Sequence, residues 1–251
     1  MRKIFLFFIL VSILLVSMFL AGCGSKEVKP EGAYDAEKYL ADADKMMGEQ
    51  KYDEARKLLL EVKNRDSQKK YGAIAQLKIA DTYIKDDDPD LAIVEYRKFI
   101  DNYPDNQFAS YAQYQIAMAY FSQIKSPDRG TGVAKNALAE FKRLKQLYPR
   151  NPYRDIVDIR IEKTETTLAD GDFMIGEFYY KKEAYLAAIG RLEDLLVKWP
   201  AYRSADKALL LIGKSYRALK MNDKAKEALD RLIQKYPTSD AAKEATKLPI
   251  L

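Results

Sequence analysis

The capacity for covalent chemistry in this sequence is concentrated at one cysteine. Cys23 closes the run Leu20-Ala21-Gly22-Cys23, in which small residues precede the thiol. Small residues let the backbone enter a signal peptidase, and the thiol is then the acceptor for a diacylglyceryl group. The pattern predicts cleavage before Cys23 and a covalent lipid on its sulfur. Because the sequence contains 1 cysteine, no internal disulfide is expected.

Composition argues against the common catalytic and metal sites. The sequence contains 0 histidines, which removes the commonest general base and the commonest metal ligand. Zinc centres and Ser-His-Asp or Cys-His catalysis are therefore not expected. Carboxylates are numerous, but no pattern pairs them in a cleft. We expect no enzyme, no small-molecule substrate and no cofactor other than the covalent lipid.

Two local motifs resemble ligand sites, but their spacing predicts ordinary structure. The acidic run 86–90 lacks the spaced ligands and closing glutamate of a calcium loop. Asp88 stands before Pro89, which is the arrangement of a helix N-cap followed by a proline in the first turn. A nucleotide-binding loop follows a strand and has a third glycine. The segment Gly130-Thr131-Gly132 has neither feature. We expect neither metal nor nucleotide.

The N-terminus predicts export. Arg2 and Lys3 precede an apolar stretch, residues 4–19, that is short for a transmembrane helix. We interpret residues 1–22 as a lipoprotein signal peptide and residues 23–34 as a lipidated, flexible tether. Removal of the signal peptide leaves 40 basic and 37 acidic residues. The resulting formal charge, near +3, is too small to indicate binding of nucleic acid. More than one acyl chain on Cys23 would anchor the chain stably to a membrane.

A repeat dominates the remaining sequence. A small residue recurs with a step of 37 residues over 43–117 and again over 176–213, and in four of the five units a second small residue comes twelve positions later. A bulky residue follows that one by four positions, and most units close with Tyr-Pro or Trp-Pro. The first small residue of each unit stands at Ala43, Ala80, Ala117, Gly176 and Gly213. This pattern resembles the tetratricopeptide repeat, in which each unit is two antiparallel helices that approach closely at the small residues.

The third unit departs from the period and divides the array. Eight extra residues lie between its two helices, around 126–132, and fourteen extra residues follow Pro149. We expect the second insertion to lengthen the helix that runs from about Tyr153 through Leu168. The predicted fold is all-α, a right-handed superhelical array of about five repeats. Its parts are 35–149 with repeats one to three, 150–246 with the long helix and repeats four and five, and a tail at 247–251.

One segment of the fourth unit is more specific than a generic repeat. Residues 177–192, Glu-Phe-Tyr-Tyr-Lys-Lys-Glu-Ala-Tyr-Leu-Ala-Ala-Ile-Gly-Arg-Leu, are similar to the signature of the BamD family. The third-unit insertion, the long helix and the cysteine box agree with that family. Two positions depart from it, because the first repeat has Asp66-Ser67 in place of Tyr-Pro and Gly190 stands where the family has asparagine.

The BamD resemblance implies a role in assembling outer-membrane β-barrels. It implies docking on the periplasmic domains of the barrel subunit BamA, beside other lipoproteins of the machinery. It also implies recognition of unfolded outer-membrane proteins through a signal near their C-terminus. Gly24 and Ser25 follow Cys23 where lipoproteins kept in the inner membrane commonly carry aspartate. The expected location is the periplasmic face of the outer membrane, through the lipid anchor.

Two candidate binding surfaces follow from the repeat and from the family. Concave faces of such arrays hold extended ligands, and apolar grooves mark binding surfaces. The first helices of repeats two and three supply a predicted client groove, with packing inside the array as the alternative, at Ile74, Leu77, Asp81, Ile84, Tyr111, Tyr114, Met118 and Phe121. The family segment adds Tyr185 and Arg191 as a predicted partner interface, where Arg191 could instead pair with Glu183 or Asp194.

A different function remains open at this point. Other periplasmic tetratricopeptide lipoproteins coordinate cell-envelope or cell-division proteins. Such arrays are usually more regular, and they lack the combination of the third-unit insertion with a long helix. The irregular spacing of this chain therefore favours the assembly role.

Overall fold

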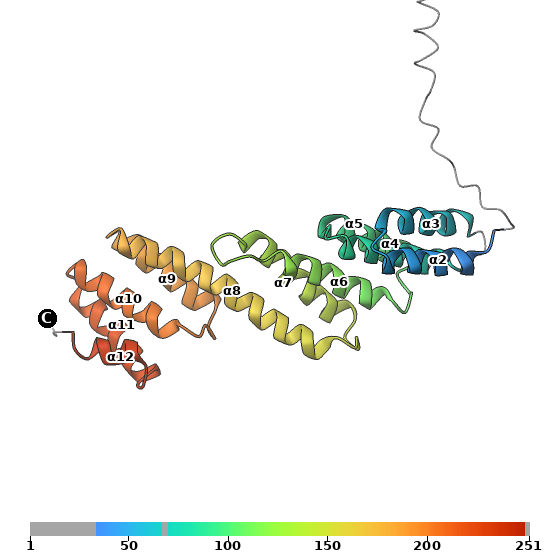
Figure 1. The fold of residues 1–251 in the computed structure, drawn as a ribbon. Coiled ribbons are helices and arrows are strands. Elements are labelled where there is room, and N and C mark those ends of the chain that lie inside the picture. Colours follow the sequence, from blue (N-terminus) through green and yellow to red (C-terminus); the bar gives the residue numbers. More distant parts are fainter. Residues whose placement is uncertain (1–33, 67–69, 249–251) are drawn as a thin grey trace, which may run out of the picture. The chain divides into compact units, whose positions relative to one another are not determined.

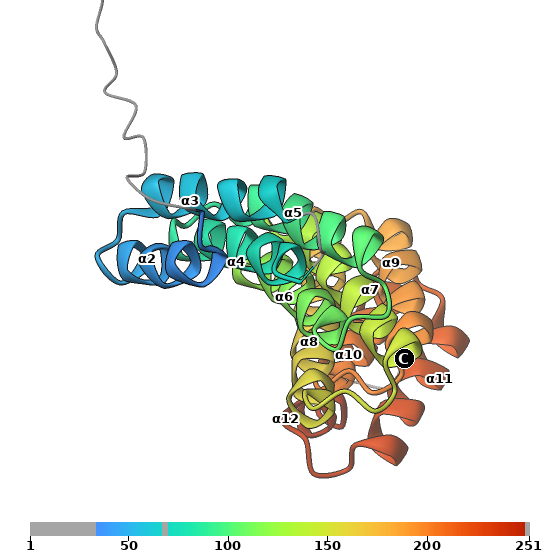
Figure 2. The ribbon, with the colours of Figure 1, turned by 90° about the vertical axis from the view of Figure 1, so that its right-hand side faces the viewer.

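The computed structural model describes residues 34–66 and 70–248. Most of these residues lie in helices that follow one another as antiparallel pairs (Figure 1). Within these residues all regular structure is helical. The helices are α2 (Ala36–Gly48), α3 (Tyr52–Arg65), α4 (Gly72–Lys85), α5 (Pro89–Asn102), α6 (Ala109–Ser122), α7 (Thr131–Leu147), α8 (Arg154–Lys181), α9 (Tyr185–Lys198), α10 (Ala205–Ala218), α11 (Asn222–Lys235) and α12 (Asp240–Ala245). From α2 onward they form one unit, in which each helix packs on the next along the chain (Figure 2). The all-α repeat prediction is confirmed.

The recurring small residues lie where the two helices of a repeat touch. Ala43, Ala80 and Ala117 are fully buried. At Gly176, an added Cβ would lie 2.5 Å from Cδ2 of Leu192, and at Gly213 the same distance separates it from Cδ2 of Leu229. Distances under 3 Å leave no room for the atom, so glycine is what lets α8 approach α9 and α10 approach α11.

The turns between paired helices share one backbone conformation. Gln50, Asp87, Glu183 and Lys220 all have φ between 57° and 60°, in the left-handed region. The next residue in each turn donates its N–H to a carbonyl five positions earlier, as in the Lys51-to-Met46 bond of 2.8 Å. This bond satisfies a carbonyl that the helix end would leave unpaired. Repeat three replaces the turn with its insertion.

The aromatic-proline pairs end the second helices as the sequence predicts. The residue before each proline is the C-cap, and its N–H donates to a carbonyl of the last turn. In the first repeat, Asp66 is the C-cap of α3 in place of an aromatic residue. The carboxylate of Asp66 accepts backbone N–H groups from Lys70, Tyr71 and Gly72, and so caps the start of α4. Asp66 therefore has a capping role at the position where the other repeats have Tyr or Trp.

The long helix predicted after repeat three is α8, which has 28 residues, twice the 14 of α9. Its first half packs on α7 and its second half is the first helix of repeat four. At Gly171 an added Cβ would lie 2.8 Å from the carbonyl oxygen of Pro127. The insertion of repeat three therefore packs directly on the backbone of α8 at Gly171.

The C-terminal end carries a short helix, α12, beyond the five predicted helix pairs. The side chain of Ser239 accepts the N–H of Ala242 at 3.1 Å, which caps α12. Three alanines of α12 are buried against Leu210 and Leu232 of repeat five. A short helix that covers the last apolar face is how repeat arrays end.

Candidate partner-binding surfaces

The predicted groove residues on α4 do not share one environment. Ile74 and Asp81 are half-buried, and Ile84 is at the edge of exposure with 36% of its surface accessible. Leu77 is 4% exposed and belongs to the core between α4, α5 and α6. The expectation that Leu77 lines a groove is therefore wrong, because its side chain points between the helices and packs with Tyr96 and Phe99.

Asp81 links three helices through one carboxylate oxygen. The hydroxyl of Tyr96 donates to Oδ1 of Asp81 at 2.5 Å, and the hydroxyl of Tyr111 donates to the same oxygen at 2.9 Å. Gln115 Nε2 donates to the oxygen of Tyr111 at 2.8 Å. Burial raises the pKa of Asp81, although the two hydroxyls and nearby lysines oppose the shift. Burial and the neighbouring carboxylate raise the pKa of Tyr111 to about 12.

We expect Asp81→Asn to make stability less dependent on pH. A carboxyl whose folded pKa is raised contributes stability below its unfolded pKa, and that contribution is lost as pH rises through the folded value. Asparagine keeps an oxygen for both tyrosine hydroxyls and carries no charge. Urea unfolding of the variant and the parent should show the variant gaining relative stability from about pH 4 to about pH 7. A difference that stays constant over this range would contradict the desolvation of Asp81.

The predicted groove residues on α6 form a second cluster, which we call the α6 row: Tyr114, Met118 and Phe121. All three are half-buried and pack on the core between α6, α7 and α8. The Tyr114 ring stacks on Tyr153, with centroids 4.3 Å apart and planes at 11°. Phe121 meets Phe141 edge-on at 6.0 Å. Part of each ring is therefore used for packing between repeats, and part remains accessible.

The polar contact between the two helices of a repeat is different in repeat four, where Arg191 takes the place of a glutamate. In repeats two and three a glutamine of the first helix bonds a glutamate of the second. Gln76 Nε2 donates to Glu95 Oε2 at 2.6 Å, and Gln113 Nε2 donates to Glu140 Oε2 at 2.8 Å. By the repeat spacing, Asp172 and Arg191 hold these two positions in repeat four.

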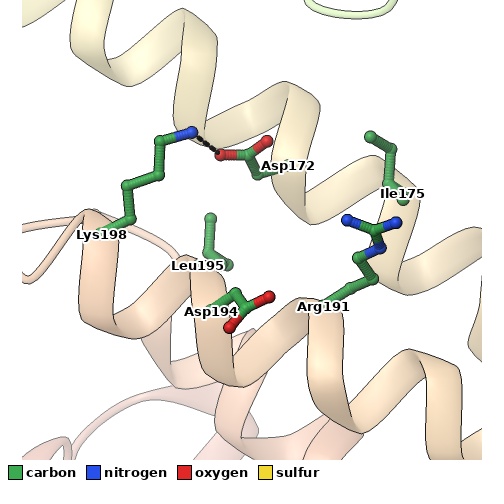
Figure 3. A pocket seen from close by; sticks show the side chains of 6 residues that line it. All are labelled: Asp172, Ile175, Arg191, Asp194, Leu195 and Lys198. Carbon is green, nitrogen blue, oxygen red and sulfur yellow. Dashed lines mark hydrogen bonds and ion pairs between the residues drawn. The ribbon is translucent and has the colours of Figure 1, made fainter.

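Asp172 turns away from Arg191 and leaves a cavity between α8 and α9. Its Oδ2 accepts hydrogen bonds from Nζ of Lys198 at 2.9 Å and from the indole N–H of Trp199 at 2.8 Å. The cavity has a volume of about 350 Å³, and its lining residues are those of Figure 3, Asp172, Ile175, Arg191, Asp194, Leu195 and Lys198. Arg191 is exposed, and within the described residues it forms no hydrogen bond or ion pair, including with Glu183 or Asp194.

Repeat four also has exposed apolar side chains on α8 and α9 that are not among the predicted site residues. Ile175 lines the cavity and is 43% exposed, and Phe178, one turn further along α8, is 54% exposed. Leu186 at the start of α9 is 69% exposed. Tyr185, the other predicted interface residue, is half-buried with its ring 5.8 Å from that of Tyr180. The spacing of Ile175 and Phe178 along one helical face was the signal for an unpartnered apolar strip.

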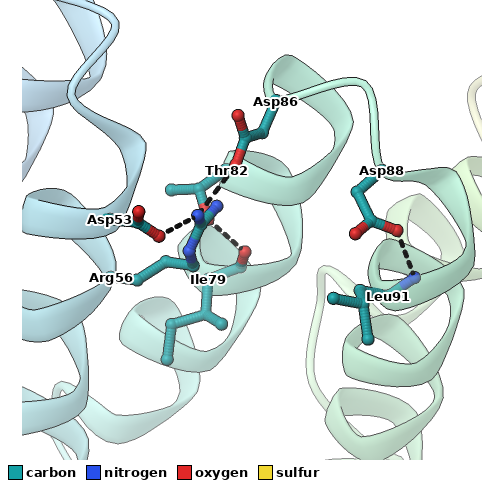
Figure 4. A network of polar contacts seen from close by, with 7 residues as sticks. All are labelled: Asp53, Arg56, Ile79, Thr82, Asp86, Asp88 and Leu91. Atoms are coloured by element: carbon teal, nitrogen blue, oxygen red, sulfur yellow. Dashed lines mark hydrogen bonds and ion pairs between the residues drawn. The ribbon is translucent and has the colours of Figure 1, made fainter.

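The acidic run after α4 has the structural role that its sequence predicts. Asp88 Oδ1 accepts the N–H of Leu91 at 3.1 Å (Figure 4). Pro89 occupies the first turn of α5. Asp86 accepts Arg56 Nη2 at 2.8 Å, which ties repeat one to repeat two. The Arg56 guanidinium also lies 4.4 Å from the centre of the Tyr83 ring. Across residues 34–66 and 70–248, no cluster of acidic residues could hold a metal ion.

The predicted lipid site, Cys23, lies outside the described residues, as do the signal peptide and most of the tether. Among the helices that are described, none is both long and apolar enough to cross a membrane.

A family model and curated relatives match most of this chain. Residues 33–232 match the YfiO family, described as "Outer membrane lipoprotein". The outer membrane protein assembly factor BamD of Caulobacter vibrioides is 27% identical over 220 residues, covering 86% of this chain and 72% of that protein. BamD of Vibrio cholerae is 29% identical over 185 residues, covering 68% and 76%.

Solved structures with some similarity to this chain include tetratricopeptide proteins. The TPR2AB domain of yeast Sti1 has a TM-score of 0.45 and 14% identity, covering 84% of this chain and 81% of that one. The type IV pilus biogenesis factor PilW has a TM-score of 0.37 and 14% identity, covering 86% and 100%. The family match spans most of the sequence, and the chain therefore belongs to the YfiO/BamD family of outer membrane lipoproteins.

Proposed function

We propose that this chain is a non-catalytic scaffold for the assembly of outer-membrane proteins, anchored by a lipid on Cys23 to the periplasmic face of the outer membrane. The observation that carries the proposal is the family match over residues 33–232. The curated relatives are named as outer membrane protein assembly factors. The helical-hairpin array supports the same role, because arrays of this kind present extended surfaces to other proteins.

In this proposal BamA docks on repeat four, at the cavity between α8 and α9 that Arg191 lines. Arg191 is an exposed cation beside a cavity, and the apolar side chains of Ile175 and Phe178 lie close by on α8. An arginine among apolar neighbours is typical of residues that dominate binding energy at interfaces. A carboxylate on a periplasmic domain of BamA would enter the cavity and pair with the guanidinium, while apolar residues cover the strip. Tyr185, the first residue of α9, belongs to the same repeat.

The client-binding surface in this proposal belongs to repeats one to three. Ile74, Ile84, Tyr111 and the α6 row keep part of their apolar surface accessible. An unfolded outer-membrane protein offers alternating apolar side chains to such a surface. Because these rings are half-buried, a bound peptide would contact only part of each ring. Most of the favourable free energy of those contacts is offset by the cost of ordering the peptide. Binding should be weak and reversible, which suits transfer of a client to BamA. Other lipoproteins of the machinery would occupy the remaining surface.

We expect Arg191→Glu to reduce capture of BamA by about tenfold or more, because a reversed charge repels the partner carboxylate that the parent binds. The measurement is co-purification of BamA with the tagged, full-length lipoprotein from membranes. Arg143→Glu is the matched control, since Arg143 is an exposed arginine on α7 of the other half. Equal amounts of BamA with the parent and with Arg191→Glu would remove Arg191 from the interface. Absence of BamA and of outer-membrane proteins from every preparation would overturn the proposed function.

A further inference from the structure

A sixth repeat begins after α11 and stops within its first helix. The step of 37 residues that separates Gly176 from Gly213 would place the next small residue at position 250. The sequence has Ile250 there, and Pro249 before it cannot donate the N–H that a helix interior requires. α12 has 6 residues, whereas α10, the first helix of repeat five, has 14. α12 therefore covers only the first part of the face that α11 presents to a following helix.

Between repeats four and five, the later part of the first helix covers the equivalent face. Ile212, in the second half of α10, is buried in the same core as Leu192 and Leu195 of α9. The hydroxyl of Tyr216, one turn further along α10, donates to Glu193 Oε1 of α9 at 3.0 Å. A first helix that ended as early as α12 does would lack both side chains and leave this part of α9 uncovered.

A cavity of about 310 Å³ lies at this uncovered place on α11. Leu229 lines it and is the counterpart of Leu192 one step of 37 residues later. Ile233, one turn further along α11, is also part of the lining, as are Ala245 and Leu248 at and after the end of α12. Because Leu248 is the last described residue, the described chain ends on the wall of the cavity.

The polar side chains of the lining leave one cation available. Lys226 pairs with Asp230 at 2.6 Å across one turn of α11. Arg217, at the end of α10, forms no hydrogen bond or ion pair within residues 34–66 and 70–248. Its guanidinium can donate to the backbone carbonyls of a segment that enters the cavity. A short apolar peptide, whose side chains gain from burial and whose carbonyls need donors, fits this lining.

We propose that Ile250 and Leu251 of this chain fold back into the cavity and close the array against α11. Both side chains are apolar and follow the wall residue Leu248 directly after Pro249. At about 3.3 Å per residue, the two positions reach about 7 to 10 Å from Leu248. A segment joined this closely to its site competes at an effective concentration on the order of millimolar. The tail thus takes the place of a sixth repeat and closes the last face of the array to other apolar segments.

An engineered disulfide tests the position of the tail in the full-length lipoprotein, purified in detergent. Leu251→Cys is paired with Ile233→Cys on the cavity wall. The matched control pairs Leu251→Cys with Arg231→Cys, because Arg231 is on the same helix but lines a different cavity. A disulfide requires Cα atoms within about 7 Å, so we expect the first pair to oxidise about tenfold faster than the control pair. Peptide mapping after timed oxidation measures both rates.

Two results of the disulfide experiment would overturn the proposal. Equal oxidation rates for the two pairs would show that the tail has no preference for the cavity. A disulfide that joins two chains instead of one would assign the cavity to the tail of a second copy.

Thermal unfolding of the same preparation tests whether the contact stabilises the array. Ile250→Ser with Leu251→Ser should lower Tm by about 4 °C, because two apolar side chains lose their burial. Leu186→Ser with Val197→Ser is the control and should leave Tm unchanged, since these side chains are 69% and 82% exposed. Ile233→Ala should cost less in the tail variant than in the parent, because a shared contact is lost only once. An unchanged Tm in the tail variant, or fully additive losses, would contradict the contact.

Discussion

Gly213→Leu should destabilise repeat five by about 3 kcal/mol, the upper part of the usual cost of overpacking. An added Cβ at Gly213 would already lie 2.5 Å from Cδ2 and 2.7 Å from Cγ of Leu229, before any larger side chain is built. Relief requires α10 to move away from α11, and that movement exposes the core beneath both helices. In a repeat array such a loss falls on one repeat and its neighbours. Urea unfolding followed by circular dichroism should show a separate early transition.

Gly190→Leu is the matched control for this prediction. Gly190 also lies inside a helix, but it is exposed, and no atom lies within 4 Å of its added Cβ. Leucine there gains helix propensity and should stabilise α9 by about 0.5 kcal/mol. If the Gly213→Leu and Gly190→Leu proteins unfold at the same urea concentration, the close approach of α10 and α11 does not restrict the size of the side chain at position 213. Alanine at Gly213 should cost less than leucine, because repeats one to three hold alanine at the same position.

Cys23→Ser should abolish processing and stable membrane anchoring of the mature chain. Serine has no thiol to accept the diacylglyceryl group, and without the lipid the signal peptidase of lipoproteins has no substrate. The unprocessed chain should remain in the inner membrane through its apolar segment, residues 4–19. Membrane fractionation with mass analysis of the N-terminus tests this. Membrane affinity rises sharply with the number of acyl chains, so the loss of anchoring should be close to complete.

Ser25→Ala is the control for the anchor, since it alters a neighbouring hydroxyl and leaves the thiol in place. It should be cleaved, lipidated and sorted like the parent. A Cys23→Ser protein that is cleaved and found in the outer membrane would refute the interpretation of residues 20–23 as a lipoprotein box.

The repeat fold could be predicted because each of its rules is local. Small residues at fixed spacing, a proline after an aromatic residue and Asp88 before Pro89 all act within one hairpin. The extra residues after Pro149 predicted a lengthened helix from about Tyr153 through Leu168, and α8 continues beyond Leu168 to Lys181. α12 was missed because its apolar content is three alanines in six residues, too little for a periodic signal. Its cap, Ser239, was the available clue.

The surfaces could be predicted less well because they depend on contacts between repeats. The sequence places Leu77 and Tyr111 on first helices, but it does not show that Leu77 turns into the core or that Tyr111 bonds Asp81. The stacking of Tyr114 on Tyr153 joins residues from two repeats. The cavity at Arg191 arises because Asp172 bonds Lys198 and Trp199 instead. Such choices between alternative partners appear only when neighbouring helices are in place.

The continuous backbone of α8 has a consequence for how the array opens. At about 1.5 Å per residue, its 28 residues extend about 42 Å with no loop at which strain could be absorbed. Repeats three and four each contribute packing to it, so local opening at one end removes support from the other. Amide hydrogens along α8 should then exchange as one cooperative group rather than as two. A protein bound at repeat four would slow exchange near Tyr153, and a peptide on the α6 row would slow it near Phe178. That reciprocity is a coupling free energy between two binding events on one helix.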